Sequence, residues 1–306
     1  MNKIEFGDCR DIMRQWAVDG VKAQTCVTSP PYFGLRDYGH EGQIGLEQTP
    51  EEYIAAMVEV FRAVWDVLAD DGTLWLNIGD SYYNYRPGKG QALVKQTVSS
   101  TNQDLPQTCA RRGNKLDGLK EKDLIGIPWM LAFALRADGW YLRQDIIWHK
   151  PNPMPESVRD RCTKAHEYIF LLSKSQQYFF DSEAMKEPAS KAGKINSSFV
   201  GRQGTAKYQS QNGGVGSPAK NYETRNRRSV WTVATRPYKG AHFATFPTAL
   251  IEPCILAGSR KGDIVLDPFM GSGTTAAVAI QHERQYLGCE LNPEYAALQQ
   301  ERINGN

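Results

Sequence analysis

The chain has 306 residues, of which 41% are hydrophobic and 23% charged, and its formal net charge is +2. This length accommodates one large α/β domain or two small ones with a substantial core. No stretch of about 18 uncharged apolar residues occurs, and the N-terminus lacks a basic-then-apolar signal pattern, so we expect a soluble, cytoplasmic protein without a membrane partner. The six cysteines are scattered without a C-x-x-C pair, which favours reduced core thiols over disulfides or a metal site.

The small net charge is unevenly distributed along the chain. Residues 182–231 contain nine Lys or Arg and three Glu, and residues 86–122 contain eight Lys or Arg and three acids, so the remainder carries a net charge of −9. Basic segments on an otherwise acidic body are typical of a protein that binds a polyanion. Solvated, lysine-rich loops would produce the same pattern.

Apolar segments of strand and helix character alternate along the chain. Strands are expected at 3–6, 21–27, 73–78, 140–149, 166–173, 263–266 and 285–289. Helices are expected at 9–16, 49–68, 127–135, 247–256 and from the glycine-rich stretch to about 282. This alternation predicts an α/β fold with a parallel, doubly wound sheet. Residues 86–122 and 182–231 lack apolar periodicity and are predicted to form long loops.

The segment Thr28-Ser29-Pro30-Pro31-Tyr32 directly follows the strand predicted at 21–27. Each proline fixes φ near −65° and lacks an N–H, and the second proline biases the first toward extended geometry. The resulting stiff turn can hold a hydroxyl, a carbonyl oxygen and an aromatic ring around a flat, amine-bearing ligand. A simple proline turn at a strand end is the alternative.

A second motif, Asp267-Pro268-Phe269-Met270-Gly271-Ser272-Gly273-Thr274-Thr275, follows the strand predicted at 263–266. No lysine follows the glycines, which excludes a phosphate-binding NTPase loop. The motif fits G-x-G-x-x-A, and the acidic Glu290 follows the first of these glycines by nineteen residues. Dinucleotide-binding enzymes and methyltransferases share this pattern, because both hold an adenosine ribose near an acid at the end of the next strand.

Taken together and in this order, the two motifs resemble those of the amino-group DNA methyltransferases whose catalytic tetrad precedes the glycine-rich cofactor loop. The resemblance implies a Rossmann-like methyltransferase sheet with inserted, loop-rich DNA-recognition regions. It assigns residues 1–180 and 232–306 to the catalytic domain, with an insertion at about 86–122, and residues 182–231 to target recognition. It also implies S-adenosylmethionine as cofactor and double-stranded DNA as partner. A homodimer and a cognate restriction endonuclease are further partners that it allows.

The resemblance assigns catalysis to Ser29, Pro30, Pro31 and Tyr32. The Ser29 side chain and the Pro30 carbonyl would accept both N–H groups of an exocyclic amine, so that its lone pair is localised for in-line attack on the methyl group. Tyr32 would stack on a base that has been flipped out of the duplex. No metal or covalent enzyme intermediate is needed for this reaction.

The resemblance also implies a set of cofactor-binding residues along the same edge of the sheet. They are Asp8, Thr28, Phe246, Asp267, Pro268, Phe269, Gly271, Ser272, Gly273, Thr274, Thr275, Glu290 and Asn292, with Thr245 beside Phe246. Asp267 would accept from the cofactor ammonium and Glu290 from both ribose hydroxyls. Asp8 would accept from the adenine amino group, or it would cap the helix that follows it. Core packing by the two phenylalanines and helix capping by the two threonines are the alternatives for those residues.

The serine of the first motif bears on the target base. In the family that the chain resembles, Ser-Pro-Pro-Tyr is mostly associated with cytosine N4, so Ser29 predicts N4-methylation of cytosine, with adenine N6 as the alternative. An RNA or protein methyltransferase, a nicotinamide oxidoreductase and an inactive DNA-binding module are the remaining possibilities. Arg36 and Tyr38 are candidates for contact with DNA, and Asp80 follows another strand and is expected near the site.

Overall fold

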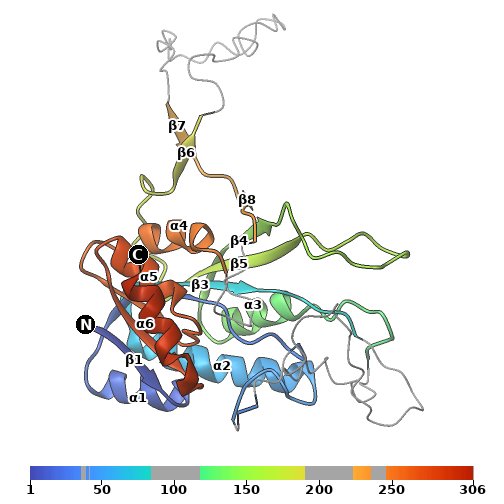
Figure 1. Cartoon of the computed structure of the whole chain (residues 1–306), viewed down its shortest axis with the longest axis horizontal. Helices are drawn as coiled ribbons and strands as arrows, with labels where there is room; N and C mark the ends of the chain where they lie inside the picture. The colour runs from blue at the N-terminus through green and yellow to red at the C-terminus, as the bar shows by residue number, and fades with distance from the viewer. Residues whose placement is uncertain (36–38, 41, 84–117, 190–222, 236–245, 306) are drawn as a thin grey trace, which may run out of the picture.

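The computed structural model describes residues 1–35, 39–40, 42–83, 118–189, 223–235 and 246–305, which form one main sheet covered by helices. The strands of this sheet are β1 (Asn2–Phe6), β2 (Ala23–Thr28), β3 (Leu68–Ile78), β4 (Tyr141–His149), β5 (His166–Ser173), β8 (Val230–Thr232), β9 (Ile264–Asp267) and β10 (Gln285–Glu290). Their spatial order is β1-β10-β9-β2-β3-β5-β4-β8. The predicted doubly wound, mostly parallel sheet is confirmed (Figure 1).

One strand of the main sheet runs against its neighbours. β5 pairs antiparallel with both β3 and β4, whereas all other described neighbours in this sheet are parallel. The carboxyl ends of β1, β10, β9, β2, β3 and β4 therefore meet at one edge, and the beginning of β5 joins them there. Chain order reverses between β9 and β2, which makes this point the topological switch where open α/β sheets bind ligands.

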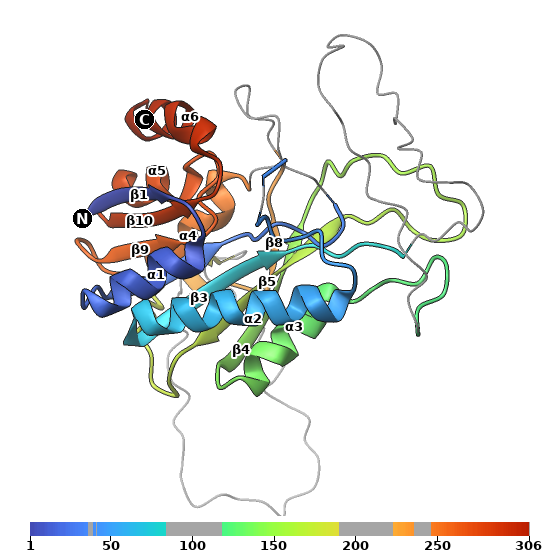
Figure 2. The same cartoon turned by 90° about the horizontal axis from the view of Figure 1, so that it is seen from below.

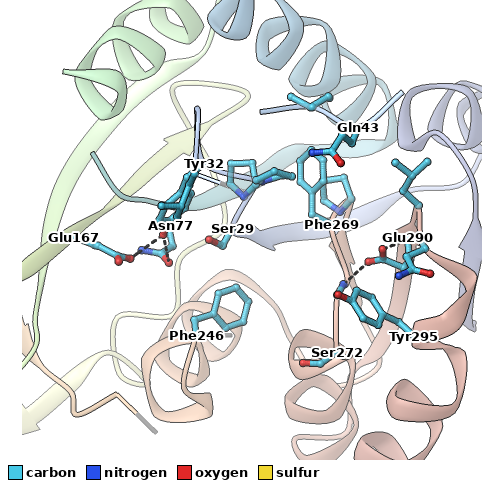
Figure 3. A pocket seen from close by; sticks show the side chains of 18 of the residues that line it. Ser29, Tyr32, Gln43, Asn77, Glu167, Phe246, Phe269, Ser272, Glu290 and Tyr295 are labelled. Atoms are coloured by element: carbon cyan, nitrogen blue, oxygen red, sulfur yellow. Dashed lines mark hydrogen bonds between the residues drawn. The ribbon is translucent and has the colours of Figure 1, made fainter. Parts of the chain in front are cut away.

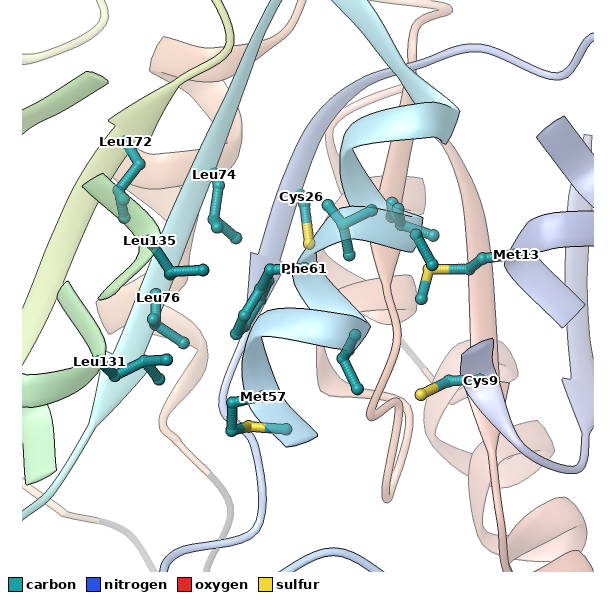
Figure 4. Packing of buried hydrophobic residues seen from close by; sticks show 14 of the residues in the cluster. Cys9, Met13, Cys26, Met57, Phe61, Leu74, Leu76, Leu131, Leu135 and Leu172 are labelled. Carbon is teal, nitrogen blue, oxygen red and sulfur yellow. The ribbon is translucent and has the colours of Figure 1, made fainter. Parts of the chain in front are cut away.

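Helices cover both faces of the sheet (Figures 1 and 2). They are α1 (Cys9–Val18), α2 (Pro50–Val67), α3 (Ile127–Ala137), α4 (Thr248–Gly258), α5 (Thr274–Gln281) and α6 (Ala296–Asn304). Neighbouring strand residues point to opposite faces, so Cys26 and Leu74 pack with α1 to α3, whereas Val27 and Trp75 pack with α4 and α5. Figure 4 shows Phe61 of α2 packed toward Cys26 and Leu74 in the first core.

Local signals explain where the helices of the first face begin. α2 starts with a complete capping box, in which the Thr49 hydroxyl accepts from the Glu52 backbone N–H and the Glu52 carboxylate accepts from the Thr49 N–H. The start of α3 carries no cap of its own, and the Asp80 carboxylate accepts from the backbone N–H groups of Gly126 and Ile127 instead. Asp80, expected near the site, therefore caps α3.

Three features differ from the simplest prediction. β8 begins within 182–231, the range predicted for target recognition, and ends one residue beyond it, yet it pairs with β4 in the main sheet. In the same range β6 (Lys186–Pro188) and β7 (Thr224–Asn226) form a separate two-stranded ribbon beyond α4 (Figure 1). Helix α6 follows a short 3₁₀ turn at Pro293–Tyr295 and is not predicted from the sequence.

None of the described helices has the length and apolar composition that a membrane span requires.

Helix α4 packs closely on the sheet at Gly258, the last residue of the helix. A Cβ at this position would lie 2.6 Å from Thr25 Oγ1 and 3.0 Å from Thr73 Oγ1. Gly→Ala substitutions at compatible sites stabilise proteins by about 0.4–1 kcal/mol, but here we expect Gly258→Ala to lower the free energy of unfolding by about 1–3 kcal/mol through overpacking. Urea denaturation measures this change. A gain in stability would contradict the packing described here.

Candidate active site at the carboxyl edge of the sheet

A cavity of about 780 Å³ lies at the carboxyl edge of the sheet, within the size range of cofactor sites. The predicted residues that line it are Asp8, Ser29, Pro30, Pro31, Tyr32, Phe246, Pro268, Phe269, Gly271, Ser272, Glu290 and Asn292. Figure 3 shows Ser29 between two groups of side chains, which we call the target lobe (Tyr32, Asn77, Glu167) and the cofactor lobe (Phe269, Glu290, Tyr295). The structure thus brings the two motifs together around one space.

The Ser29–Tyr32 turn is held from outside the cavity by helix α2. The Tyr53 hydroxyl donates to the Pro31 carbonyl oxygen at 2.8 Å. Sequence periodicity predicts Tyr53 only as a core residue, and its ring is indeed fully buried. No hydrogen bond to the Pro30 carbonyl is formed within the described part of the chain. Helix α2 thus holds the Pro31 carbonyl, while the described residues leave unused the Pro30 carbonyl that is predicted to bind substrate.

Tyr32 is fixed at both its ring and its hydroxyl. The hydroxyl donates to Glu167 Oε2 at 2.8 Å and also interacts with the Ser29 side chain. The ring lies against Gly79, where an added Cβ would be only 2.7 Å from Tyr32 Cε2. Burial beside the Glu167 carboxylate holds the pKa of Tyr32 well above its usual value, so the phenol keeps its proton and its orientation.

The far wall of the target lobe is a polar cluster that sequence reasoning missed. Glu167 Oε2 also accepts from Asn77 Nδ2 at 3.3 Å, and Glu167 Oε1 pairs with the Lys150 ammonium. Lys150 Nζ in turn lies 4.3 Å from the centre of the Trp148 ring. Glu167 escaped notice because a parallel strand at 166–173 would place it at the opposite edge of the sheet. The antiparallel direction of β5 brings it to the site.

The cofactor lobe is organised around Glu290 at the end of β10. Its two carboxylate oxygens accept from the backbone N–H groups of Gly271, at 2.7 Å, and Asn292, at 2.9 Å. The Leu291 backbone N–H also contributes a hydrogen bond to this carboxylate. A carboxylate offers about four lone-pair sites, so part of its acceptor capacity remains for a ligand hydroxyl. Burial raises the pKa of Glu290. The apolar side chains of Phe246, Phe269, Ile44, Leu291 and Leu298 also line the cavity.

This donor and acceptor set fits S-adenosylmethionine. A half-buried carboxylate with acceptor capacity to spare suits a ribose diol, and the flanking apolar side chains suit an adenine ring. In the glycine loop, Gly273 adopts φ 82° and an added Cβ would lie 3.3 Å from Gln299 Cα, so glycine at this position lets the loop pack closely against helix α6. Asp8 also lines this space, but it caps α1 by accepting from the Arg10 N–H at 2.8 Å. Its contact with an adenine amino group stays a prediction.

Asp267 lies behind the cavity wall. It is 1% exposed and accepts from the hydroxyls of Thr28, at 2.7 Å, and Thr275, at 2.6 Å, and from the Phe269 N–H at 3.0 Å. Its burial raises the pKa to about 6, against the effect of these hydrogen bonds. Thr28, Gly273, Thr274 and Thr275 do not line the cavity either. A contact between Asp267 and the cofactor ammonium stays a prediction.

Helix α6 secures the glycine loop from its outer side. Gln299 Nε2 donates to the Gly271 carbonyl at 2.8 Å, and Arg302 Nη1 donates to Ser272 Oγ at 2.6 Å. Gln299 is 2% exposed, which is unusual for a glutamine and marks it as part of the loop's support. Arg36, Tyr38 and Thr245 lie outside the described residues, as do most of the ranges 86–122 and 182–231.

An open, mostly parallel sheet with a ligand cavity at its switch point and a buried acid beside a glycine loop defines an α/β enzyme for a nucleoside-type cofactor. Residues 23–301 match the family model described as DNA methylase, and the chain belongs to this N6/N4 DNA methyltransferase family. It is an enzyme of DNA methylation, and S-adenosylmethionine is the cofactor of the family, as the motifs predict.

Relatives agree with this assignment, and solved structures share the fold. The chain is 46% identical to the Type II methyltransferase M.Cfr9I of Citrobacter freundii, covering 98% of this chain and 86% of that protein. It is 47% identical to the Type II methyltransferase M.SmaI of Serratia marcescens, covering 98% and 90%. The fold matches the PvuII DNA methyltransferase (cytosine-N4-specific) with a TM-score of 0.62 at 17% identity, covering 99% and 86%. It also matches a putative DNA modification methylase of Thermus thermophilus, solved with S-adenosyl-L-methionine, with a TM-score of 0.60 at 22% identity, covering 100% and 94%.

The raised pKa of Asp267 predicts a specific pH dependence of stability. Since the folded state holds this proton up to pH 6 and the unfolded chain only to about 3.8, the Asp267 contribution to stability is present at low pH and is lost as pH rises through that window. The loss amounts to about 3 kcal/mol at 1.36 kcal/mol per pKa unit. We expect the difference in unfolding free energy between wild type and Asp267→Asn to fall by about 2 kcal/mol from pH 4 to pH 7, because the unfolded carboxyl is already partly ionised at pH 4. A difference independent of pH would contradict the burial cost assigned to this carboxylate.

Proposed function

We propose that this enzyme transfers a methyl group from S-adenosylmethionine to the exocyclic N4 of a cytosine flipped out of a specific DNA sequence. The observation that carries the proposal is the place of Ser29, at the junction of the target and cofactor lobes (Figure 3). A group held at Ser29 faces the target lobe on one side and the cofactor lobe on the other.

The cofactor lobe supplies the contacts that would hold S-adenosylmethionine. Glu290 would accept from the ribose hydroxyls, Phe246 and Phe269 would contact apolar parts of the cofactor, and the Gly271 to Gly273 loop would lie along its methionine portion. Asn292 and Ser272 line the same space. When bound, the cofactor supplies an electrophilic methyl group on its sulfonium centre.

The Ser29 turn would activate the target amine. The lone pair of an exocyclic amine is delocalised into the base, so the nitrogen is a poor nucleophile. The Ser29 hydroxyl and the Pro30 carbonyl would accept its two N–H groups in fixed directions, which favours a tetrahedral nitrogen with a localised lone pair. Fixed placement supplies most of the acceleration, because a positioned pair avoids the entropy cost of encounter. The Tyr53 contact to Pro31 supports that placement.

Tyr32 would form the stacking platform for the flipped base. Its ring rests on Gly79 and its hydroxyl is held by Glu167, so little side-chain freedom is lost when a base stacks on it. Stacking of a base on an aromatic side chain contributes about 1–3 kcal/mol. This contribution offsets part of the cost of removing the base from the duplex.

Cytosine is favoured over adenine as the target because the turn begins with serine. The family pattern associates Ser-Pro-Pro-Tyr mostly with cytosine N4, and the PvuII enzyme that shares the fold is cytosine-N4-specific by its name. Adenine N6 is the second candidate, since the same acceptors also suit its amine. RNA or protein as the methyl acceptor is less consistent with a DNA methylase family match.

The partners follow from the same proposal. Double-stranded DNA would contact the basic segments at 86–122 and 182–231, which carry net charges of +5 and +6 on an acidic body. The Type II names of the relatives support a role beside a cognate restriction endonuclease in the cytoplasm, and a homodimer is compatible with it.

The role of Ser29 can be separated from cofactor binding by substitution. We expect Ser29→Ala to lower kcat by about 10²–10³-fold, the scale seen when one preorganised polar contact to a reacting group is removed. The dissociation constant for S-adenosylmethionine, measured by calorimetry, should change less than about twofold. Unchanged turnover would contradict the proposal, and loss of cofactor binding in a folded variant would assign Ser29 to the cofactor lobe instead.

A further inference from the structure

The proposed reaction leaves two cavity residues, Trp148 and Lys150, without a role. Lys150, Glu167 and Trp148 all line the cavity beyond Tyr32, on the side away from the cofactor lobe. Trp148 and Glu167 are directly opposite in the antiparallel pairing of β4 with β5. Lys150 follows Trp148 by two residues, so its side chain lies on the same face of the sheet as that of Trp148. The strands thus present an ammonium group, a carboxylate and an indole ring to the target lobe.

The ion pair between Lys150 and Glu167 is largely buried, and one N–H donor of its ammonium group has no partner among the described residues. The Lys150 and Glu167 side chains are 18% and 15% exposed, and withdrawing two charges from water carries a desolvation cost that a well-packed apolar pair would not carry. The Lys150 ammonium has three N–H donors, of which Glu167 accepts one and the Trp148 ring faces another. Among the described residues it makes no further hydrogen bond. At least one donor is therefore available to a ligand in the cavity.

Cytosine and adenine differ at the position of the base edge to which such a donor could bind. Along the edge that carries the amine, cytosine presents the N4 donor, the N3 acceptor and then the O2 acceptor. Adenine presents the N6 donor, the N1 acceptor and then a C2–H. When the amine of a base is held at Ser29, the third position (O2 of cytosine or C2–H of adenine) lies on the side of the base edge away from Ser29. An ammonium group on the far wall of the target lobe can therefore donate a hydrogen bond to O2 of cytosine. With adenine the same N–H would face C2–H and remain without an acceptor.

We propose that Lys150 selects cytosine by donating a hydrogen bond to O2 of the flipped base, with Glu167 and Trp148 holding its ammonium group in place. This inference rests on the proposed function and names the residue that sets its base preference. A site that loses a designed polar contact discriminates strongly against the analogue that lacks the partner atom. Glu167 then has two roles in the target lobe, because it also fixes the Tyr32 hydroxyl.

Lys174 provides a matched control within the same sheet. Its ammonium lies 5.6 Å from the centre of the Trp65 ring and 3.3 Å from Asp70 Oδ1, and its side chain is 13% exposed. Lys174 does not line the cavity. Lys174→Met therefore removes a largely buried lysine from a tryptophan and a carboxylate without changing the proposed base contact.

The test is a chemical double-mutant cycle on duplex DNA. The recognition site is first mapped from methylated genomic DNA, and the target cytosine of an oligonucleotide is then replaced by 2-thiocytosine, which keeps N4 and N3 but weakens the acceptor at position 2. We expect Lys150→Met to lower kcat/KM on cytosine by about 10–100-fold and the thio substitution to lower it for wild type about 10-fold. In Lys150→Met the thio substitution should have no further effect, and the ratio of cytosine to adenine methylation should fall. Lys174→Met and Lys150→Arg should retain the thio effect.

Each other outcome has a definite meaning. Additive effects of Lys150→Met and the thio substitution would overturn the contact with O2. A uniform loss of DNA affinity with a shallower salt dependence would make Lys150 a phosphate contact and also overturn it. If Lys150→Met does not fold, Lys150→Met combined with Glu167→Gln removes both charges, and the same cycle is measured on that variant. Methylation of adenine by the wild-type enzyme would instead refute the proposed function, independently of this cycle.

Discussion

The buried carboxylate of Asp267 holds the two halves of the site in one frame. It lies where the chain order of the sheet reverses, and it accepts hydrogen bonds from Thr28 at the end of β2 and from Thr275 at the start of α5. The residue after Thr28 is Ser29, the proposed catalytic serine, and the residues before Thr275 form the glycine loop. One side chain therefore ties the turn that would hold the target amine to the loop that would hold the cofactor. Because amine methylation depends mainly on placement, this fixed spacing is the central requirement of the enzyme.

The reversed strand β5 completes the site from the other side. Its antiparallel direction places Glu167 at the edge where the parallel strands end, and its pairing with β4 brings Trp148 and Lys150 to the same wall. The target lobe is thus built by a local departure from the parallel fold. Helix α6 plays the corresponding part for the cofactor lobe by holding the glycine loop through Gln299.

The sequence was sufficient to predict a doubly wound, mostly parallel sheet and to place the two motifs at the same edge of it. Strand ends and glycine loops carry strong local signals for both. The sequence could not predict the direction of β5, since an apolar strand reads the same in either orientation, and Glu167 was missed with it. Carboxylates at strand ends were ambiguous for a similar reason. Asp8 and Asp80 both cap helices, and only the three-dimensional neighbours distinguish a cap from a ligand contact. Tyr53 reads as core, and its hydroxyl gains a role only through the nearby Pro31 carbonyl.

The identity of the methylated nucleoside tests the account most directly. The purified enzyme is incubated with isotope-labelled S-adenosylmethionine and unmodified DNA, the DNA is digested to nucleosides, and the labelled species is identified by mass spectrometry. The account predicts label in N4-methylcytosine. Label in N6-methyladenine would retain the activation of an exocyclic amine but contradict the base assigned from Ser29 and Lys150. No labelled nucleoside across DNA of varied sequence would contradict the proposed reaction itself.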